Sequence, residues 1–139
     1  MRIADHLLAT LDRVSAPMTV RAHCDLPCGV YDPAQARIEA ESVKATMEKF
    51  NASSDETFKV RATIIKEQRA DLVKQHLWIL WTDYFKPEHL EAYPQLHDLF
   101  WRATKTAGES KKTNDVAVAD RLLSEIADID TIFWATKKG

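Results

Sequence analysis

Apolar residues recur at helical spacing along most of this chain, and polar or helix-breaking residues separate the periodic stretches. The pattern predicts a short amphipathic segment in residues 1–22 and four longer helices, over about 33–50, 54–85, 94–107 and 114–136. Short loops connect these four helices, which is typical of antiparallel neighbours. The sequence therefore predicts an all-α fold, an up-down four-helix bundle over residues 32–139.

Local signals mark the starts of the first two helices. Asp32 followed by Pro33 predicts a helix start, because a carboxylate can cap free N–H groups and proline fits the first turn. Ser53 with Glu56 three residues later resembles a capping box that opens the second helix.

Proline and glycine delimit the later helices. Pro87 is expected to end the second helix and open the third, and Pro94 to bend or restart it. Gly108 is expected to close the third helix. Thr113 or Asn114 is then the expected cap of the last helix.

The second predicted helix carries a seven-residue repeat, which marks a packing seam. Two sets of residues follow this repeat: Phe58, Ile65, Leu72 and Ile79, and also Ala62, Arg69, His76 and Asp83. Arg69 then lies on or beside an apolar face, where a charge is costly unless it is paired. The alternative is that its long side chain reaches water. The apolar segment 77–85 is expected to be buried between helices or between subunits.

Composition narrows the possible functions. The chain has 139 residues, 45% of them hydrophobic and 29% charged, which is typical of one soluble globular domain. The net charge is −2 and there is no basic block, so we do not expect nucleic acid as a partner. No apolar stretch approaches the roughly 20 residues of a membrane span.

The two cysteines lie in the segment His23-Cys24-Asp25-Leu26-Pro27-Cys28-Gly29-Val30-Tyr31. Cys24 and Cys28 are four positions apart, so both thiolates can reach one ion from a single loop. If the chain were cut before His23, the new amine, the Cys24 amide and the two sulfurs would form a compact donor set. Fused chelate rings favour a square plane, and square-planar N and S donors indicate nickel or copper. The His23 ring could then approach along the axis.

Other sites fit this sequence less well. A di-iron bundle needs Glu-x-x-His pairs, and no histidine here has an acidic residue three positions before it. A thiol oxidoreductase typically has two residues between its cysteines and a βαβ context, whereas three residues lie between Cys24 and Cys28. An idle thiol pair or a local disulfide remains an alternative.

The segment 23–31 resembles the metal hook of the nickel-containing superoxide dismutases, and the likeness continues through the helical remainder. It implies a superoxide dismutase that uses one nickel ion per subunit, with His23, Cys24 and Cys28 as ligands. Two thiolates and an ionised amide would lower the Ni(II)/Ni(III) potential into the range needed to oxidise one superoxide and reduce another. His23 and Tyr31 are the implied catalytic residues.

The same resemblance assigns roles to other positions. Glu39 and Arg69 are implied to hold the axial histidine ring, since a carboxylate that accepts from the imidazole fixes its orientation. Tyr84, with Tyr31, is implied to line the approach to the metal. Asp25 and Pro27 are implied to shape the hook, with a cis bond expected before Pro27. Lys86 is implied to attract the anionic substrate.

The resemblance also implies processing and assembly. Residues 1–22 correspond to a pro-sequence that a maturation protease removes between Ala22 and His23, leaving 23–139 as the enzyme. They lack the continuous apolar run of a secretory signal, which favours a cytoplasmic protein. A homohexamer is implied. The alternatives are a nickel or copper metallochaperone module without turnover, and a helical interaction module that binds no nickel.

Overall fold

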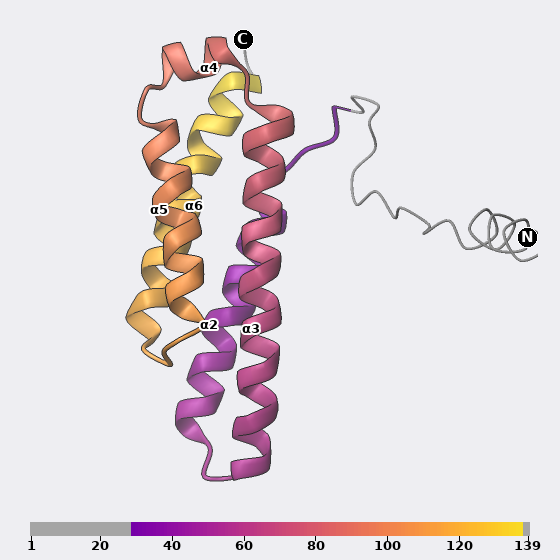
Figure 1. Cartoon of the computed structure of the whole chain (residues 1–139), viewed down its shortest axis with the longest axis vertical. Helices are drawn as coiled ribbons and strands as arrows, with labels where there is room; N and C mark the ends of the chain where they lie inside the picture. The colour runs from indigo at the N-terminus through magenta and orange to yellow at the C-terminus, as the bar shows by residue number, and fades with distance from the viewer. Residues whose placement is uncertain (1–28, 138–139) are drawn as a thin grey trace, which may run out of the picture.

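The computed structural model describes residues 29–137, and all regular structure in this part of the chain is helical. The elements are α2 (Ala34–Ala52), α3 (Glu56–Ile79), the π-helical turn η1 (Leu80–Tyr84), α4 (Pro87–Ala92), α5 (Leu96–Ser110) and α6 (Val116–Lys137). The long helices α2, α3, α5 and α6 lie side by side and alternate in direction, and α4 lies across one end of the bundle (Figure 1). The expected all-α helical bundle is confirmed; residues 23–28 of the hook lie outside the described part.

The start of α2 agrees with the prediction. The Asp32 carboxylate accepts a hydrogen bond from the Ala34 N–H at 2.8 Å, and Pro33 precedes the first residue of the helix. This local chemistry fixes where the extended chain of residues 29–32 becomes helical. It therefore also fixes where the hook joins the bundle.

The predicted cap of α3 is wrong by two residues. Asp55, not Ser53, is the N-cap, and its carboxylate accepts from the N–H groups of Thr57 and Phe58. Ser53 instead accepts from the Asp55 N–H through its hydroxyl. A carboxylate is the stronger acceptor at a helix N-terminus, because it carries a full negative charge toward the positive end of the helix dipole.

The predicted packing seam of α3 is only partly right, because Ala62 alone among its positions is buried. Phe58 and Ile65 are 38% and 42% exposed, and Leu72 and Ile79 are half-buried. The buried positions of α3 are Ala62, Lys66, Ala70, Val73 and Leu77. The α2 residues Ala36 and Ala40 share a core cluster with Val73 and Leu77 of α3. Ala70 of α3 lies in a second cluster, with Val43 and Met47 of α2, so small residues of one helix meet larger ones of the other. The size of the apolar side chains therefore misled the sequence-based choice of face.

The connection from α3 to α5 contains both predicted proline breaks. The helix continues through the π-helical turn, in which the Phe85 N–H donates to the Leu80 carbonyl at 3.0 Å. Pro87 opens α4, and a turn at Pro94 separates α4 from α5. Gly108 does not end α5, contrary to the prediction, because the helix continues to Ser110.

The residue that caps α6 is Asp115, whereas Thr113 or Asn114 was predicted. The Asp115 carboxylate accepts from the Ala117 N–H at 3.0 Å, while the Thr113 hydroxyl accepts from the Asp115 N–H. Asn114 is engaged elsewhere, because its side-chain oxygen accepts from the buried Lys66 ammonium at 2.9 Å. Lys66 thereby joins the middle of α3 to the loop between α5 and α6.

Besides a smaller cluster around Val43 and Met47, a main apolar core runs through the bundle and becomes aromatic toward the α4 end. It includes Leu77, Leu96, Leu122, Ile126 and Phe133, all at most 1% exposed. At the opposite end the α2–α3 hairpin extends beyond α5 and α6 (Figure 1). Between residues 29 and 137, no helix combines the length and the apolar character that a bilayer span requires.

Candidate metal centre

The expected ligands His23, Cys24 and Cys28 lie outside the described residues, as do the hook-shaping residues Asp25 and Pro27 and the expected cis bond before Pro27. The described chain begins with Gly29, the residue after Cys28. Gly29 has φ +71°, a left-handed conformation that glycine adopts without strain. The chain therefore turns directly after the last expected ligand.

Tyr31 and Tyr84, which the resemblance places near the metal, lie together. Their ring centroids are 5.7 Å apart, with the rings tilted by 54°. Tyr84 also packs on Phe133 of α6, with 4.4 Å between centroids, and is stacked on His89 at 5.7 Å. The extra residue of the π-helical turn, which ends at Tyr84, changes the direction of the side chains that follow it. Such turns are frequent at functional sites.

The Tyr84 hydroxyl has a defined hydrogen bond. It lies 2.6 Å from the Thr136 hydroxyl oxygen, and the Thr136 hydroxyl donates its single hydrogen to the Phe133 carbonyl at 2.6 Å. Because Thr136 has no second hydrogen to give, Tyr84 must be the donor in this pair. The lone pairs of the Tyr84 oxygen therefore remain able to accept from a water or from a protonated ligand.

Glu39 and Arg69, the expected supports of the histidine ring, form an ion pair between α2 and α3. Nη1 of Arg69 lies 3.0 Å from Oε2 and 3.3 Å from Oε1 of Glu39. The Glu39 side chain is only 14% exposed, whereas that of Arg69 is 42% exposed. Arg69 is therefore paired, and its outer part also reaches solvent. Within residues 29–137 no hydrogen bond joins this pair to the tyrosine pair.

Lys86 lies one residue after Phe85, at the N-terminus of α4, and its side chain is exposed. Its backbone N–H donates to Nδ1 of His89 at 3.2 Å. Because Nδ1 is the acceptor, the neutral His89 ring carries its proton on Nε2. The stacked His89 ring and the exposed Lys86 charge thus border the Tyr84 cluster.

Three residues of this region were not selected from the sequence as parts of the site: Phe133, Thr136 and Lys137. The Lys137 ammonium lies 3.3 Å from the Gly29 carbonyl oxygen, and this contact joins residues 108 positions apart. It also lies 5.2 Å from the centroid of the Tyr84 ring. The spacing of residues along the chain does not predict the contact between Lys137 and Gly29, because the two lie near opposite ends of the described chain. The apolar stripe of the last helix, which includes Phe133, was the nearest indication.

The donor chemistry fits nickel better than an oxygen-preferring metal, because two thiolates and nitrogen donors are soft ligands. Outside the hook, in the part of the chain that the structure describes, no three His, Cys, Asp or Glu side chains gather closely enough to hold an ion. The groups that the resemblance assigns to the site and that the structure describes include the Glu39 carboxylate and two tyrosines; the Lys137 cation lies beside Gly29, which directly follows the expected ligand Cys28.

Comparison with known proteins gives concordant results. A family model described as nickel-containing superoxide dismutase matches residues 18–137. "Superoxide dismutase [Ni]" of Streptomyces seoulensis is 60% identical over 129 residues, which cover 92% of this chain and 98% of that protein. The corresponding protein of Streptomyces coelicolor is 58% identical over the same shares.

Solved structures agree with this result. A native nickel superoxide dismutase structure is 58% identical and has a TM-score of 0.82, with 84% of this chain covering 100% of that one. A nickel-containing superoxide dismutase with ligation corresponding to the oxidised state is 61% identical, with the same TM-score and coverage. These matches span the helical bundle and the Gly29–Tyr31 end of the hook. The chain therefore belongs to the family of nickel-containing superoxide dismutases.

Proposed function

We propose that this chain is the precursor of a superoxide dismutase that becomes competent when a protease cuts between Ala22 and His23. The activity and the nickel cofactor follow from family membership; the cut is the proposal. The solved relative is covered in full by 84% of this chain, which is the share that residues 23–139 represent. The curated relatives match over 129 residues, more than lie between His23 and the C-terminus. These lengths support a leading segment that the solved chains lack.

The proposed nickel ligands are the amine and imidazole of His23, the Cys24 amide and thiolate, and the Cys28 thiolate. When bound, nickel would supply a one-electron cycle between Ni(II) and Ni(III), by which two superoxide ions and two protons become oxygen and hydrogen peroxide. The chain supplies soft donors and shields them, because thiolates next to peroxide are open to oxidation. The proposed shaping of the hook by Asp25 and Pro27 serves the same arrangement.

The Glu39–Arg69 ion pair is the observation that supports the proposed metal site. A carboxylate that is 14% exposed and paired with an arginine is suited to accept the N–H of the His23 ring. Such an acceptor fixes the orientation of the ring and makes it a better donor. A metal carrier gains nothing from a tuned axial ligand, so this pair favours an enzyme over a metallochaperone.

We propose that Tyr31 and Tyr84 line the approach to the metal. Their packed rings narrow the path, which favours a diatomic anion over larger ones. The Tyr84 hydroxyl, which donates to Thr136, can hold a water through its lone pairs and so order the protons that peroxide requires. The exposed Lys86 charge would attract superoxide toward this end of the bundle.

The direct test compares the uncut chain with protein cut after Ala22, each loaded with nickel. The cut protein is expected to consume superoxide and to give a Ni(III) electron paramagnetic resonance signal when oxidised. The uncut chain should show neither, because its His23 nitrogen is a peptide amide. Full activity of protein that still carries residues 1–22 would refute the proposal.

A second test addresses the thiolates. Cys24→Ser and Cys28→Ser in the cut protein should each abolish superoxide consumption, because an alcohol does not replace a thiolate as a nickel donor. Far-ultraviolet circular dichroism should show unchanged helix content, since both residues precede the bundle. A variant that keeps most of its activity would exclude that cysteine as a ligand.

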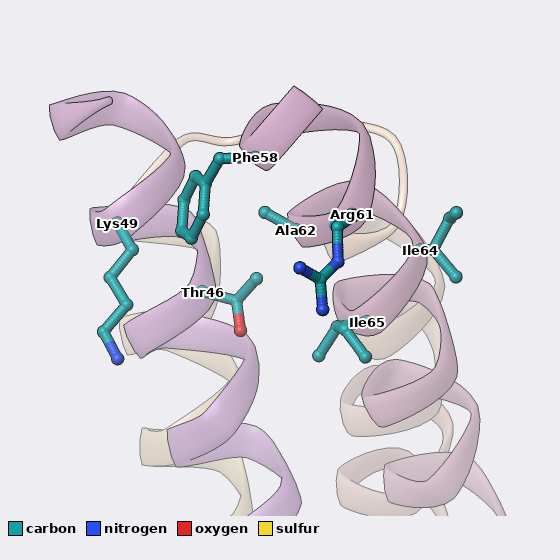
Figure 2. A pocket seen from close by; sticks show the side chains of 7 residues that line it. All are labelled: Thr46, Lys49, Phe58, Arg61, Ala62, Ile64 and Ile65. Atoms are coloured by element: carbon teal, nitrogen blue, oxygen red, sulfur yellow. The ribbon is translucent and has the colours of Figure 1, made fainter. Parts of the chain in front are cut away.

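We also propose that the protein is a cytoplasmic homo-oligomer, with the hexamer of the family resemblance as the expected form. Apolar side chains are left uncovered on the overhanging part of α3, among them Val60 at 61% and Ile64 at 52% exposed. Beside them, Phe58, Ala62 and Ile65 face Thr46 of α2 across a groove of about 400 Å³ (Figure 2). A second copy would cover this surface.

A further inference from the structure

Lys137 is the last residue of α6 that the structure describes, and it lies beside the start of the described chain. A cation is favoured at this position, because the last carbonyl groups of a helix carry partial negative charge. In residues 29–137 it forms no ion pair with a carboxylate. Its ammonium is instead directed at the Gly29 carbonyl oxygen, at 3.3 Å.

Two aromatic rings fix the direction of this side chain. The ammonium lies 5.2 Å from the centroid of Tyr84 and 5.4 Å from that of Phe133, both within the range of cation–π attraction. Phe133 is fully buried and Tyr84 is held by its bond to Thr136. The lysine is therefore presented to Gly29 from a rigid base.

Packing does little to hold the chain at Gly29 and Val30. The Val30 side chain is 79% exposed, and a side chain placed on Gly29 would meet nothing within 4 Å. The next residue that packs is Tyr31, against Tyr84. The Lys137 contact is therefore positioned to restrain the two residues between Cys28 and Tyr31.

We infer that Lys137 is a positioning residue, which ties the carbonyl of Gly29 to the end of α6 and so restrains the chain directly after Cys28. The link to the metal depends on the proposed function, because it takes Cys28 as a ligand. The contact itself does not. A cationic N–H donor to a carbonyl forms a stronger hydrogen bond than a neutral donor.

The first test uses the uncut full-length chain without metal, so that it is independent of the proposed activity. The readout is the order parameter of the Val30 amide, whose nitrogen belongs to the same peptide group as the Gly29 carbonyl. Lys137→Met should lower this order parameter from the rigid range of about 0.85 toward the flexible range below about 0.6. Lys137→Arg should retain it, because arginine also donates.

The matched control is Lys105→Met. Lys105 is also an exposed helical lysine above an aromatic ring, 5.5 Å from the centroid of Trp101, but it does not donate to the Gly29 carbonyl. It should leave the Val30 order parameter unchanged. An unchanged value in Lys137→Met, or an equal fall in Lys105→Met, would overturn the inference.

The second test uses cut, nickel-loaded protein and follows nickel release to excess EDTA. Lys137→Met should release nickel about threefold to tenfold faster than the parent, as expected for the loss of one charge-assisted hydrogen bond. The release rate of Lys137→Arg should stay within about twofold of the parent's rate. Equal release rates in Lys137→Met and the parent would overturn the role toward the metal. If no protein retained nickel but Lys137→Met still lowered the Val30 order parameter, the proposed ligands would be refuted. The positioning role of the Lys137–Gly29 contact would still be supported.

Discussion

At the scale of single residues, burial decides which charged groups matter. Glu39 and Glu41 lie on the same helix and each pairs with an arginine. The Glu39 side chain is 14% exposed, whereas the Glu41–Arg37 pair is 51% and 52% exposed. Water screens the outer pair strongly, so it contributes little to stability. Water screens the charges of the Glu39–Arg69 pair less, because Glu39 is mostly buried. Glu39 is therefore the carboxylate that can orient a ligand.

This difference gives a matched pair of variants. Glu39→Gln removes the charge with little change in shape, so the His23 ring would lose its anionic acceptor. We expect superoxide consumption by the cut, nickel-loaded protein to fall by about tenfold or more, as for other partners of metal-bound histidines. Glu41→Gln should leave the rate unchanged. Rapid-mixing assays give both rates, and equal rates for the two variants would contradict the role of Glu39.

At the scale of elements, the sequence predicted the helices better than their faces. Proline, aspartate and polar breaks are local signals, and they placed α2, α4 and the α4–α5 turn correctly. The face of α3 depends on which helix it meets, and the face it buries contains Ala62, Ala70 and Val73 while the larger Phe58 and Ile65 stay exposed. The π-helical turn at Leu80–Tyr84 had no local signal either, because the aromatic packing around Tyr84 and Phe85 stabilises it.

The site was predictable to the same extent. The proposed ligands form one contiguous motif, so the sequence alone suggested them, and they lie outside the described residues. The pairing of Glu39 with Arg69 followed from the family resemblance and from the cost of an unpaired charge near a core. The Lys137 contact with Gly29 connects the two ends of the described chain, so it required the folded structure.

Lys66 links two elements and gives a prediction on stability. It is 2% exposed, and its ammonium donates to the Thr113 carbonyl and the Asn114 side chain. Lys66→Met keeps a similar apolar volume but leaves both acceptors without this donor. We expect the free energy of unfolding at pH 7 to fall by about 1 kcal/mol, measured by urea denaturation. Lys59→Met, which removes an exposed pair with Glu56, should change it by less than about 0.5 kcal/mol.

The same residue should give a pH dependence. Burial lowers the pKa of Lys66 below its ordinary value of 10.5. Between the lowered pKa and 10.5 the unfolded chain binds more protons than the folded one, so the free energy of unfolding should rise with pH. The pKa of Lys44 is raised by its hydrogen bond to Asp120 and by the charge of that residue. Above pH 10.5, Lys44 should therefore make the free energy of unfolding fall as pH rises. A rise that persists unchanged in Lys66→Met would refute this assignment.

At the scale of the whole molecule, the two ends of the bundle differ. The end near α4 is closed by an aromatic cluster, and the other end carries an uncovered α2–α3 hairpin (Figure 1). Val60 and Ile64 are one helical turn apart on that hairpin and are both more than half exposed. Two exposed aliphatic side chains next to an apolar groove are costly for a monomer in water. Covering them with a second copy would remove that cost.

The double variant Val60→Glu, Ile64→Glu should therefore weaken assembly. Burying two carboxylates in a subunit contact without partners is strongly unfavourable. We expect the parent to sediment well above its chain mass of 15.8 kDa and the variant to sediment as a smaller species with unchanged helix content. Gln68→Glu with Gln75→Glu adds the same charge at exposed polar positions of α3 and should keep the parent mass. A parent of 15.8 kDa, or a double variant with the parent's mass, would show that this surface is not the contact between subunits.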